Sequence, residues 1–368
     1  MAFFLALCQV RTGEAFHSGG AAECRECHVD MKGSLRGSDA SSTCLRCHQA
    51  PRGTRSPTGH YIATNDGDLG AGLPPSQLTP GGDFGYLKKS YFWKASGSTE
   101  SSPGERHGHN IVADDYGYIA DSRTLSTPGE VYPNGKLSCI SCHDPHGNIA
   151  NGVYRMLGGV GYKTSLVPGT VFAVAAPVAV APRDYNRSEA LTDTRVAYGR
   201  GMSEWCSNCH TKGCSEAYGH PVCSGTRCTT EIVSNYNAYV KSGDINGRGE
   251  TSFTSLVPFE EGTDDRSVLA QHAQIDGSST SGPGYGSNVM CLTCHRAHAS
   301  AWDHIARWNM ESEFIVQKSV YPGINNGSPE RNAQGRTEAE TRKAYYDKPS
   351  SQFASFQRSL CNKCHIRD

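Results

Sequence analysis

The sequence CISCHDPH at residues 139–146 holds two cysteines separated by two residues, a histidine directly after them, and a second histidine three residues later. Two thiols at this spacing can reach the two vinyl groups of one porphyrin and form thioethers. The imidazole that follows then lies under the iron as its proximal ligand. The Cys-x-x-Cys-His pattern therefore predicts a covalently attached haem c.

The same pattern occurs six times in the 368-residue chain. A single copy would also suit a zinc knuckle or a redox dithiol, but neither gives a reason for a histidine after every cysteine pair. The sequence therefore predicts six haem c groups, each with its iron. The predicted thioether cysteines are Cys24, Cys27, Cys44, Cys47, Cys139, Cys142, Cys206, Cys209, Cys291, Cys294, Cys361 and Cys364. The predicted proximal ligands are His28, His48, His143, His210, His295 and His365.

Nine histidines remain outside the motifs, whereas six irons that are all six-coordinate need six distal ligands. His146 and His298 each follow a proximal histidine by three residues, a tether too short to reach the opposite face of the same iron. We therefore expect each of them to bind the iron of a neighbouring haem. The candidate distal ligands are His17, His60, His109, His146, His220, His272 and His298. His107 and His304 are predicted not to bind iron, since each has a better candidate nearby.

Two axial histidines leave an iron no open position for a substrate, and histidine in place of methionine lowers the reduction potential. All six motifs end in histidine, and none carries the lysine of some catalytic haems. The pattern thus favours an electron-transfer protein over an enzyme, with no catalytic residues. A multihaem reductase of nitrogen or sulfur oxyanions is the alternative from another class, and it would need one five-coordinate haem.

The composition is unusual for a chain of this length. Leu, Ile, Val and Phe together make 60 residues, about 16% of the chain, below the roughly 20% typical of chains that bury a core. Yet 35 basic and 36 acidic residues nearly cancel, so the high net charge of a disordered chain is absent. Six porphyrins would supply the missing apolar mass. No basic stretch offers a nucleic-acid footprint.

The 41 glycines and 18 prolines predict a mostly irregular, coil-rich fold with a few short α-helices, little β structure, and a core built around six stacked haems. Helical periodicity is best over residues 297–314, 231–240 and 338–346. Residues 171–182 are too short to span a membrane and are predicted to be buried extended chain. No clean linker divides the sequence, so residues 16–368 are predicted to form one hexahaem domain.

The first ten residues, MAFFLALCQV, are typical of the apolar part of a secretory signal, and small residues before Phe16 predict a signal peptide at 1–15. Its positively charged start is missing, which suggests N-terminal truncation. A short buried strand or a lipid anchor on Cys8 are the alternatives. Export agrees with haem c attachment and with a disulfide between two of Cys214, Cys223 and Cys228, although the sequence leaves open which two pair.

Several stretches away from the cysteine pairs are distinctive as well. They are FHSGG at 16–20, LTPGGDFG at 78–85, GHNIVA at 108–113, RVAYG and GMSEWC between 195 and 206, PFEEGT at 258–263, CHRAHAS at 294–300 and LCNKCH at 360–365. With them, residues 16–368 resemble the hexahaem outer-surface c-type cytochromes of metal-reducing bacteria, a family of filament-forming cytochrome nanowires. The resemblance implies bis-histidine haems stacked in parallel and perpendicular pairs, and subunits that polymerise head to tail.

One departure from the family pattern concerns the region after the first motif. The pattern has a histidine there that ligates a haem of the adjacent subunit, but VDMKGS at 29–34 contains none. Three interpretations stay open. Met31 is a thioether donor, His17 supplies the imidazole from upstream, or the bond between subunits is absent.

The main functional hypothesis is therefore extracellular electron transport by a polymer of this chain, secreted through the periplasm to the cell surface. Its expected partners are further copies of itself, other redox cytochromes, and extracellular acceptors such as metal oxides, with no nucleic acid and no membrane span. A monomeric periplasmic or surface carrier is the alternative, and the missing histidine is its main support.

Overall fold

The computed structural model describes residues 24–30, 32–54, 60–147, 154–182, 193–214, 220–223 and 225–367. The signal peptide predicted for residues 1–15, His17 and Met31 lie outside these ranges. Within them, no helix is both long enough and apolar enough to cross a bilayer.

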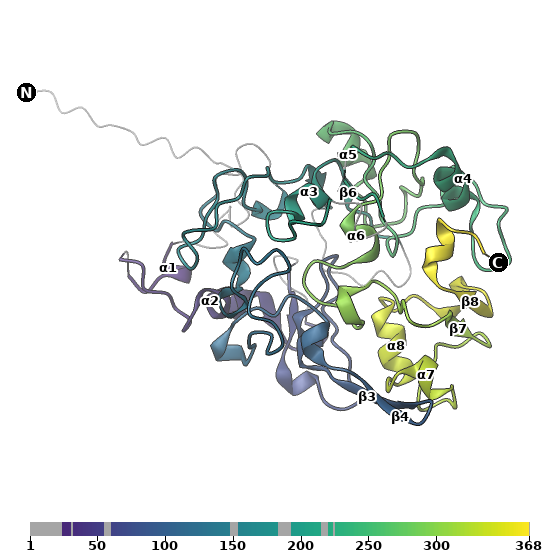
Figure 1. Cartoon of the computed structure of the whole chain (residues 1–368), viewed down its shortest axis with the longest axis horizontal. Helices are drawn as coiled ribbons and strands as arrows, with labels where there is room; N and C mark the ends of the chain where they lie inside the picture. The colour runs from purple at the N-terminus through teal and green to yellow at the C-terminus, as the bar shows by residue number, and fades with distance from the viewer. Residues whose placement is uncertain are drawn as a thin grey trace, which may run out of the picture.

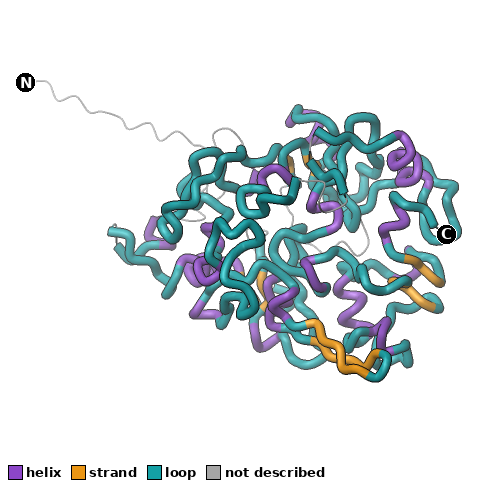
Figure 2. The backbone as a smooth tube through the Cα atoms, viewed as in Figure 1, coloured by secondary structure: helices purple, strands orange, loops and turns teal. Residues whose placement is uncertain are grey.

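Loops and single turns make up most of the described backbone, as Figure 2 shows. The α-helices are α1 (Cys24–Cys27), α2 (Ala40–His48), α3 (Met202–Cys206), α4 (Thr230–Ala238), α5 (Arg266–His272), α6 (Cys291–Cys294), α7 (Glu330–Ala333) and α8 (Glu338–Ala344). The strands are β1 (Gln49–Ala50), β2 (Ala63–Thr64), β3 (Tyr91–Ala95), β4 (Ser98–Ser102), β5 (Ala179–Val180), β6 (Ala197–Tyr198), β7 (Phe314–Gln317) and β8 (Phe356–Arg358). They pair as four two-stranded sheets, of which only β1–β2 is parallel among the described residues. The predicted coil-rich fold class is confirmed.

The better-formed helices begin at side-chain caps. The Asp39 carboxylate accepts a hydrogen bond from the Ser42 amide at 2.8 Å and starts α2. Thr337 and Glu340 form a reciprocal capping box at the start of α8. The helices predicted over 231–240 and 338–346 correspond to α4 and α8, so both predictions are confirmed.

The helix predicted over residues 297–314 was wrong. The backbone amides of this segment bond to distant carbonyls rather than to the preceding turn: His298 to Gly81 at 2.7 Å, and Ser300 to His107 at 2.9 Å. His304 and Ile305 have positive φ angles of 59° and 58°, which no α-helix of L-residues contains. The tryptophans of this segment have near-helical spacing, but they lie in a folded loop.

Residues 171–182 are extended, as predicted, but they are not buried throughout. Phe172 is buried whereas Val171 is 53% exposed, and the segment ends in β5, which pairs with β6. This alternation is typical of chain that covers a core with one side only.

The largest apolar cluster joins residues from Leu45 to Leu360, and aromatic side chains form much of it. A buried arginine lies within this aromatic region. The Arg336 guanidinium lies 4.0 Å from the Tyr91 ring centre and 4.4 Å from that of Trp302. It also donates hydrogen bonds to the carbonyls of Gln334 and Ala301. Arg336 thereby ties the β3–β4 hairpin, which packs beside α7, to the core (Figure 1).

Replacing Arg336 by alanine is expected to destabilise the protein by about 2–4 kcal/mol, because the change removes the cation–π contacts and leaves buried carbonyls without donors. The thermal unfolding midpoint of the holoprotein measures this loss. The matched control is Arg248→Ala, whose side chain is 78% exposed and whose effect should stay within about 0.5 kcal/mol. Equal midpoints for the two variants would contradict the role given to Arg336.

Candidate haem sites

Each cysteine motif is folded as one helical turn. In five motifs the histidine amide donates to the carbonyl of the first cysteine, at 2.9 Å in the first, 3.0 Å in the third, 2.9 Å in the fourth, 3.0 Å in the fifth and 2.9 Å in the sixth. The second motif lies within α2. Residues three apart share one face of a helix, so each turn presents both thiols on the same side.

Four motif histidines each face a second histidine. The ring centres are 6.1 Å apart in His28–His146, 6.3 Å in His143–His298, 6.0 Å in His109–His210 and 5.9 Å in His220–His365. Two metal–nitrogen bonds of about 2 Å, plus about 1 Å from each nitrogen to its ring centre, span roughly 6 Å. The residues present therefore fit an iron held between the two imidazoles of each pair.

The short tethers at His146 and His298 lead to neighbouring motifs. His146 follows the third motif, yet its ring faces His28 of the first. His298 follows the fifth motif, yet its ring faces His143 of the third. Each tether thus links two sites, as its length requires.

Backbone carbonyls orient several of these imidazoles through Nδ1. His48 bonds to the carbonyl of His60 at 2.7 Å, His143 to Arg155 at 2.8 Å, His295 to His304 at 2.8 Å and His109 to Ala297 at 2.7 Å. A hydrogen bond at Nδ1 fixes the tautomer and leaves Nε2 available to a metal.

Burial also favours the neutral form of four of these imidazoles, which is the form that ligates. Desolvation lowers the pKa of His298 to about 3 and that of His210 to about 4. It lowers the pKa of His143 and His109 as well. At neutral pH these four rings therefore carry no charge.

Two of the candidates, His60 and His272, contact charged side chains. The His60 ring lies 3.1 Å from the Arg155 Nη1 atom. The His272 ring bonds to the Glu261 carboxylate, which also accepts from Arg195 at 2.9 Å. No ring contact between His272 and a motif histidine occurs in the described part of the chain.

Two histidines predicted not to bind iron have other surroundings. His107 is fully buried, with Nδ1 on the Tyr86 carbonyl at 3.0 Å and Nε2 at 2.7 Å from the Ser102 hydroxyl, so both ring nitrogens are occupied. His304 has an exposed side chain, and its carbonyl orients His295. The sequence analysis did not predict this role, because every residue has a backbone carbonyl and the residue type does not show what that carbonyl binds.

Cysteines of successive motifs are neighbours. The Cys44 thiol hydrogen-bonds to Cys139, which raises the pKa of Cys44 and lowers that of Cys139. Likewise Cys206 bonds to Cys291, which raises the pKa of Cys206.

The other pairs of successive motifs are linked by charge interactions between their cysteines. Besides burial, Cys47 raises the pKa of Cys27. Burial and then Cys209 raise the pKa of Cys142 to about 12, and burial and then Cys361 raise that of Cys294 to about 12. With the two hydrogen-bonded pairs, these contacts order the six motifs in one row that follows the sequence.

The backbone segments that carry His109 and His298 cross closely, and this crossing holds the two candidate ligands near each other. The His109 amide donates to the His298 carbonyl at 3.0 Å, and Gly82 and Gly108 both pair with Ala299. A Cβ atom on Gly82, whose φ is +95°, would lie 1.7 Å from the Ala299 carbonyl oxygen. Only glycine permits this approach.

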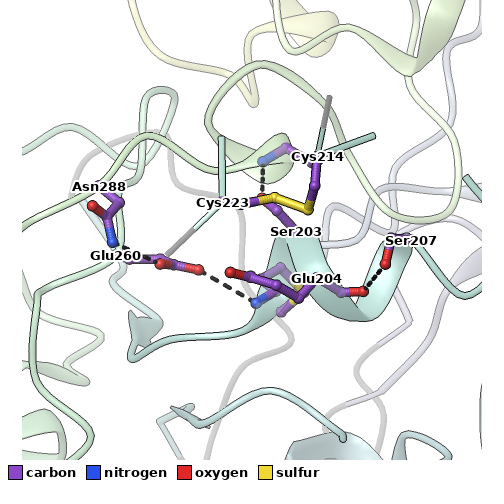
Figure 3. Close-up of a disulfide and its surroundings, with 9 residues drawn as sticks. Ser203, Glu204, Ser207, Cys214, Cys223, Glu260 and Asn288 are labelled. Carbon is purple, nitrogen blue, oxygen red and sulfur yellow. Dashed lines mark hydrogen bonds between the residues drawn. A yellow bond between two sulfur atoms is a disulfide. The ribbon is translucent and has the colours of Figure 1, made fainter. Parts of the chain in front are cut away.

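The disulfide joins Cys214 and Cys223, with Cα atoms 5.6 Å apart, and leaves Cys228 unpaired. Figure 3 shows the bond and the α3 residues Ser203 and Glu204 around it. His220 lies between the two cysteines in the sequence. The bridge therefore closes the loop that presents His220 to His365.

Comparisons with known proteins agree with this geometry. No protein-family model matches the chain. The chain is 43% identical over 413 aligned residues to the C-type cytochrome OmcS of Geobacter sulfurreducens, covering 96% of this chain and 94% of the relative. Two solved structures from the same organism, of OmcS nanowires and of an outer membrane cytochrome S filament, match with a TM-score of 0.86 and 42% identity. Each alignment covers 96% of this chain and 100% of the solved chain. The resemblance drawn from the sequence is confirmed.

Substituting alanine for Gly82 is expected to displace residues 295–300 and to perturb the two sites that contain His298 and His109, because the new Cβ would overlap the Ala299 carbonyl. Electron paramagnetic resonance of the oxidised holoprotein should show altered low-spin signals from two haems. In the control Gly135→Ala, where nothing lies within 4 Å of the added atom, the spectrum should match the parent. A parental spectrum for Gly82→Ala would contradict the shared positioning.

Proposed function

Because the chain belongs to the OmcS family of c-type cytochromes, we propose that it is the subunit of an extracellular filament that carries electrons through six bis-histidine haems. The four facing pairs of imidazoles, within a row of motifs that follows the sequence, are the observation that carries this proposal. When bound, each haem supplies a reversible one-electron iron couple. The chain is therefore an electron-transfer protein rather than an enzyme.

The protein's own part in this function is to hold and orient the haems. The cysteine turns would hold the porphyrins by thioether bonds. The pairs His28–His146, His143–His298, His109–His210 and His220–His365 would supply both axial ligands. Two axial imidazoles leave an iron no open position for water or a substrate.

Distal ligands are assigned separately for the haems at His48 and His295. For His48 the proposed ligand is His60, whose backbone carbonyl contacts the His48 ring. His295 has its Nδ1 on the His304 carbonyl, and among the described residues no second imidazole ring contacts it. We assign this position to His17 of the adjacent subunit, which would make one iron a bond between two subunits. His272 stays the alternative distal ligand within the same chain.

Assembly and location follow from the family. The two matching solved structures are described as OmcS nanowires and as a filament, and a head-to-tail interface that does not close produces such a polymer. Residues 1–15 would direct export through the periplasm to the cell surface, and residues 16–368 would act as one domain. Metal oxides and other redox cytochromes are the proposed partners at the ends of the electron path.

A monomeric carrier is the second candidate, and the absence of histidine from residues 29–34 favours it. The two proposals differ in one measurable property, the assembly state. Electron microscopy of native secreted protein should show long filaments with periodic haem density. Monodisperse monomers at high concentration would rule the filament out and leave the carrier.

The role of His17 has a direct test. His17→Ala should leave six haems attached, by mass spectrometry, but abolish polymerisation, because the bond between subunits loses its imidazole. The control is His304→Asn, which removes an exposed imidazole and tolerates the local positive φ. Filaments formed by His17→Ala at the parental yield would exclude the proposed bond.

The axial pairs are tested at His146. His146→Ala should open one coordination position on the iron of the first motif and convert one haem of six to high spin, seen by electron paramagnetic resonance. Haem stoichiometry should be unchanged, since both thioether cysteines remain. A wholly low-spin spectrum of this variant would contradict the pairing of His146 with His28.

A further inference from the structure

Charged side chains lie between the two cysteines of three of the six motifs, but only one of these side chains is buried. Arg25, Glu26 and Arg46, in the first and second motifs, are exposed. Lys363 of the sixth motif is only 4% exposed. Water and salt screen a charge at the surface, whereas a buried charge acts through a lower dielectric constant. We therefore expect Lys363 to have the strongest electrostatic effect on its own motif.

The Lys363 amine contacts groups that attract a cation. Nζ donates to the carbonyls of Tyr236 at 3.3 Å and Tyr239 at 3.4 Å, and it lies 4.1 Å from the centre of the Tyr236 ring. Tyr236 belongs to the last turn of α4, and Tyr239 follows this helix as its C-cap. Both carbonyls therefore lie at the negative end of the helix dipole, where a lysine is stabilising.

Within the described part of the chain, no carboxylate forms an ion pair with Lys363. The carboxylate whose charge reaches it, that of Asp193, forms an ion pair with Lys348 and accepts from the Ser255 hydroxyl at 3.2 Å. A buried charge without an opposite charge beside it is costly for folding. An uncharged donor could satisfy the same two carbonyls at a lower desolvation cost, so the charge points to a role beyond folding.

The charge is fixed relative to the sixth motif. Lys363 directly precedes Cys364, and its amine interacts electrostatically with the Cys364 thiol, which would carry the porphyrin. Asn235 of α4 donates from Nδ2 to the Cys364 carbonyl at 2.9 Å. The helix thus holds the motif by one neutral and one charged contact, and Figure 1 shows α4 beside the C-terminal segment that contains the turn Leu360–Lys363.

We propose that Lys363 raises the reduction potential of the haem at the sixth motif. A buried positive charge stabilises the reduced iron more than the oxidised iron, because reduction lowers the net charge of the haem by one unit. The assignment rests on the proposed haem function and deepens it, since the sixth motif is the last in the row. The charge therefore biases electrons toward the C-terminal end of the row.

The test separates the charge of Lys363 from its hydrogen bonds. Lys363→Gln keeps a donor for the carbonyls of α4 but removes the charge, so it should lower the potential of one haem. The redox equilibrium of that haem should change on the order of tenfold, which corresponds to about 59 mV for one electron. Lys363→Arg keeps the charge and should keep the parental potentials. Potentiometric titration of the holoprotein measures the six couples.

Three further variants serve as controls. Asn235→Ala removes the neutral contact with the motif, so it should lower the thermal unfolding midpoint and leave the potentials unchanged. Lys163→Gln removes an exposed charge and should change neither quantity. His220→Met, introduced beside Lys363→Gln, marks the sixth haem, because a methionine ligand raises its potential. The couple that Lys363→Gln shifts should be the marked one.

Six parental couples in Lys363→Gln would overturn the proposal, and so would a shift in a couple other than the marked one. A shift that persists in Lys363→Arg, or an equal shift in Asn235→Ala, would assign the effect to packing and overturn it as well. If Lys363→Gln fails to fold, Lys363→Met replaces it, because methionine has a similar shape and no charge.

Haem stoichiometry is measured by mass spectrometry in the same samples. Fewer than six haems in the parent protein would refute the proposed function. Six haems with unshifted couples would refute only the role of Lys363.

Discussion

Two imidazoles held near 6 Å apart are the arrangement on which the rest of this structure depends. The spacing matches a metal held between two nitrogens. The rings of each pair come from distant parts of the chain, as in His28–His146 and His143–His298. The carbonyls that hold Nδ1, the glycine crossing at Ala299 and the Cys214–Cys223 bridge all act to fix these rings.

This constraint explains why so little regular structure forms. A helix or sheet uses its amides and carbonyls within itself, whereas here many of them bond to other segments. The amide of His298 meets Gly81, and the carbonyl of Ala297 orients His109. Aromatic rings and buried arginines, as around Arg336, replace much of the aliphatic packing that the composition lacks.

The secondary-structure predictions succeeded where hydrogen bonds are local and failed where they join distant segments. The helices α4 and α8 were predictable because their caps, Thr229 and Thr337, lie next to them in the sequence. Residues 297–314 have a similar apolar spacing, yet they fold as a loop. Two of their amides donate hydrogen bonds to the carbonyls of Gly81 and His107, more than 180 residues away. No local sequence pattern reveals such a distant acceptor.

The sequence alone determined the attachment motifs, because each is contained in five consecutive residues, and it determined the supply of histidines, because that is a matter of composition. Tether length also determined that His146 and His298 must serve neighbouring motifs. Only the tertiary structure decided which rings face each other, which two cysteines are bridged, and that Lys363 lies against the end of α4. Those features arise from contacts between segments far apart in the chain, whose free energy depends on the whole packed arrangement rather than on any local run of residues.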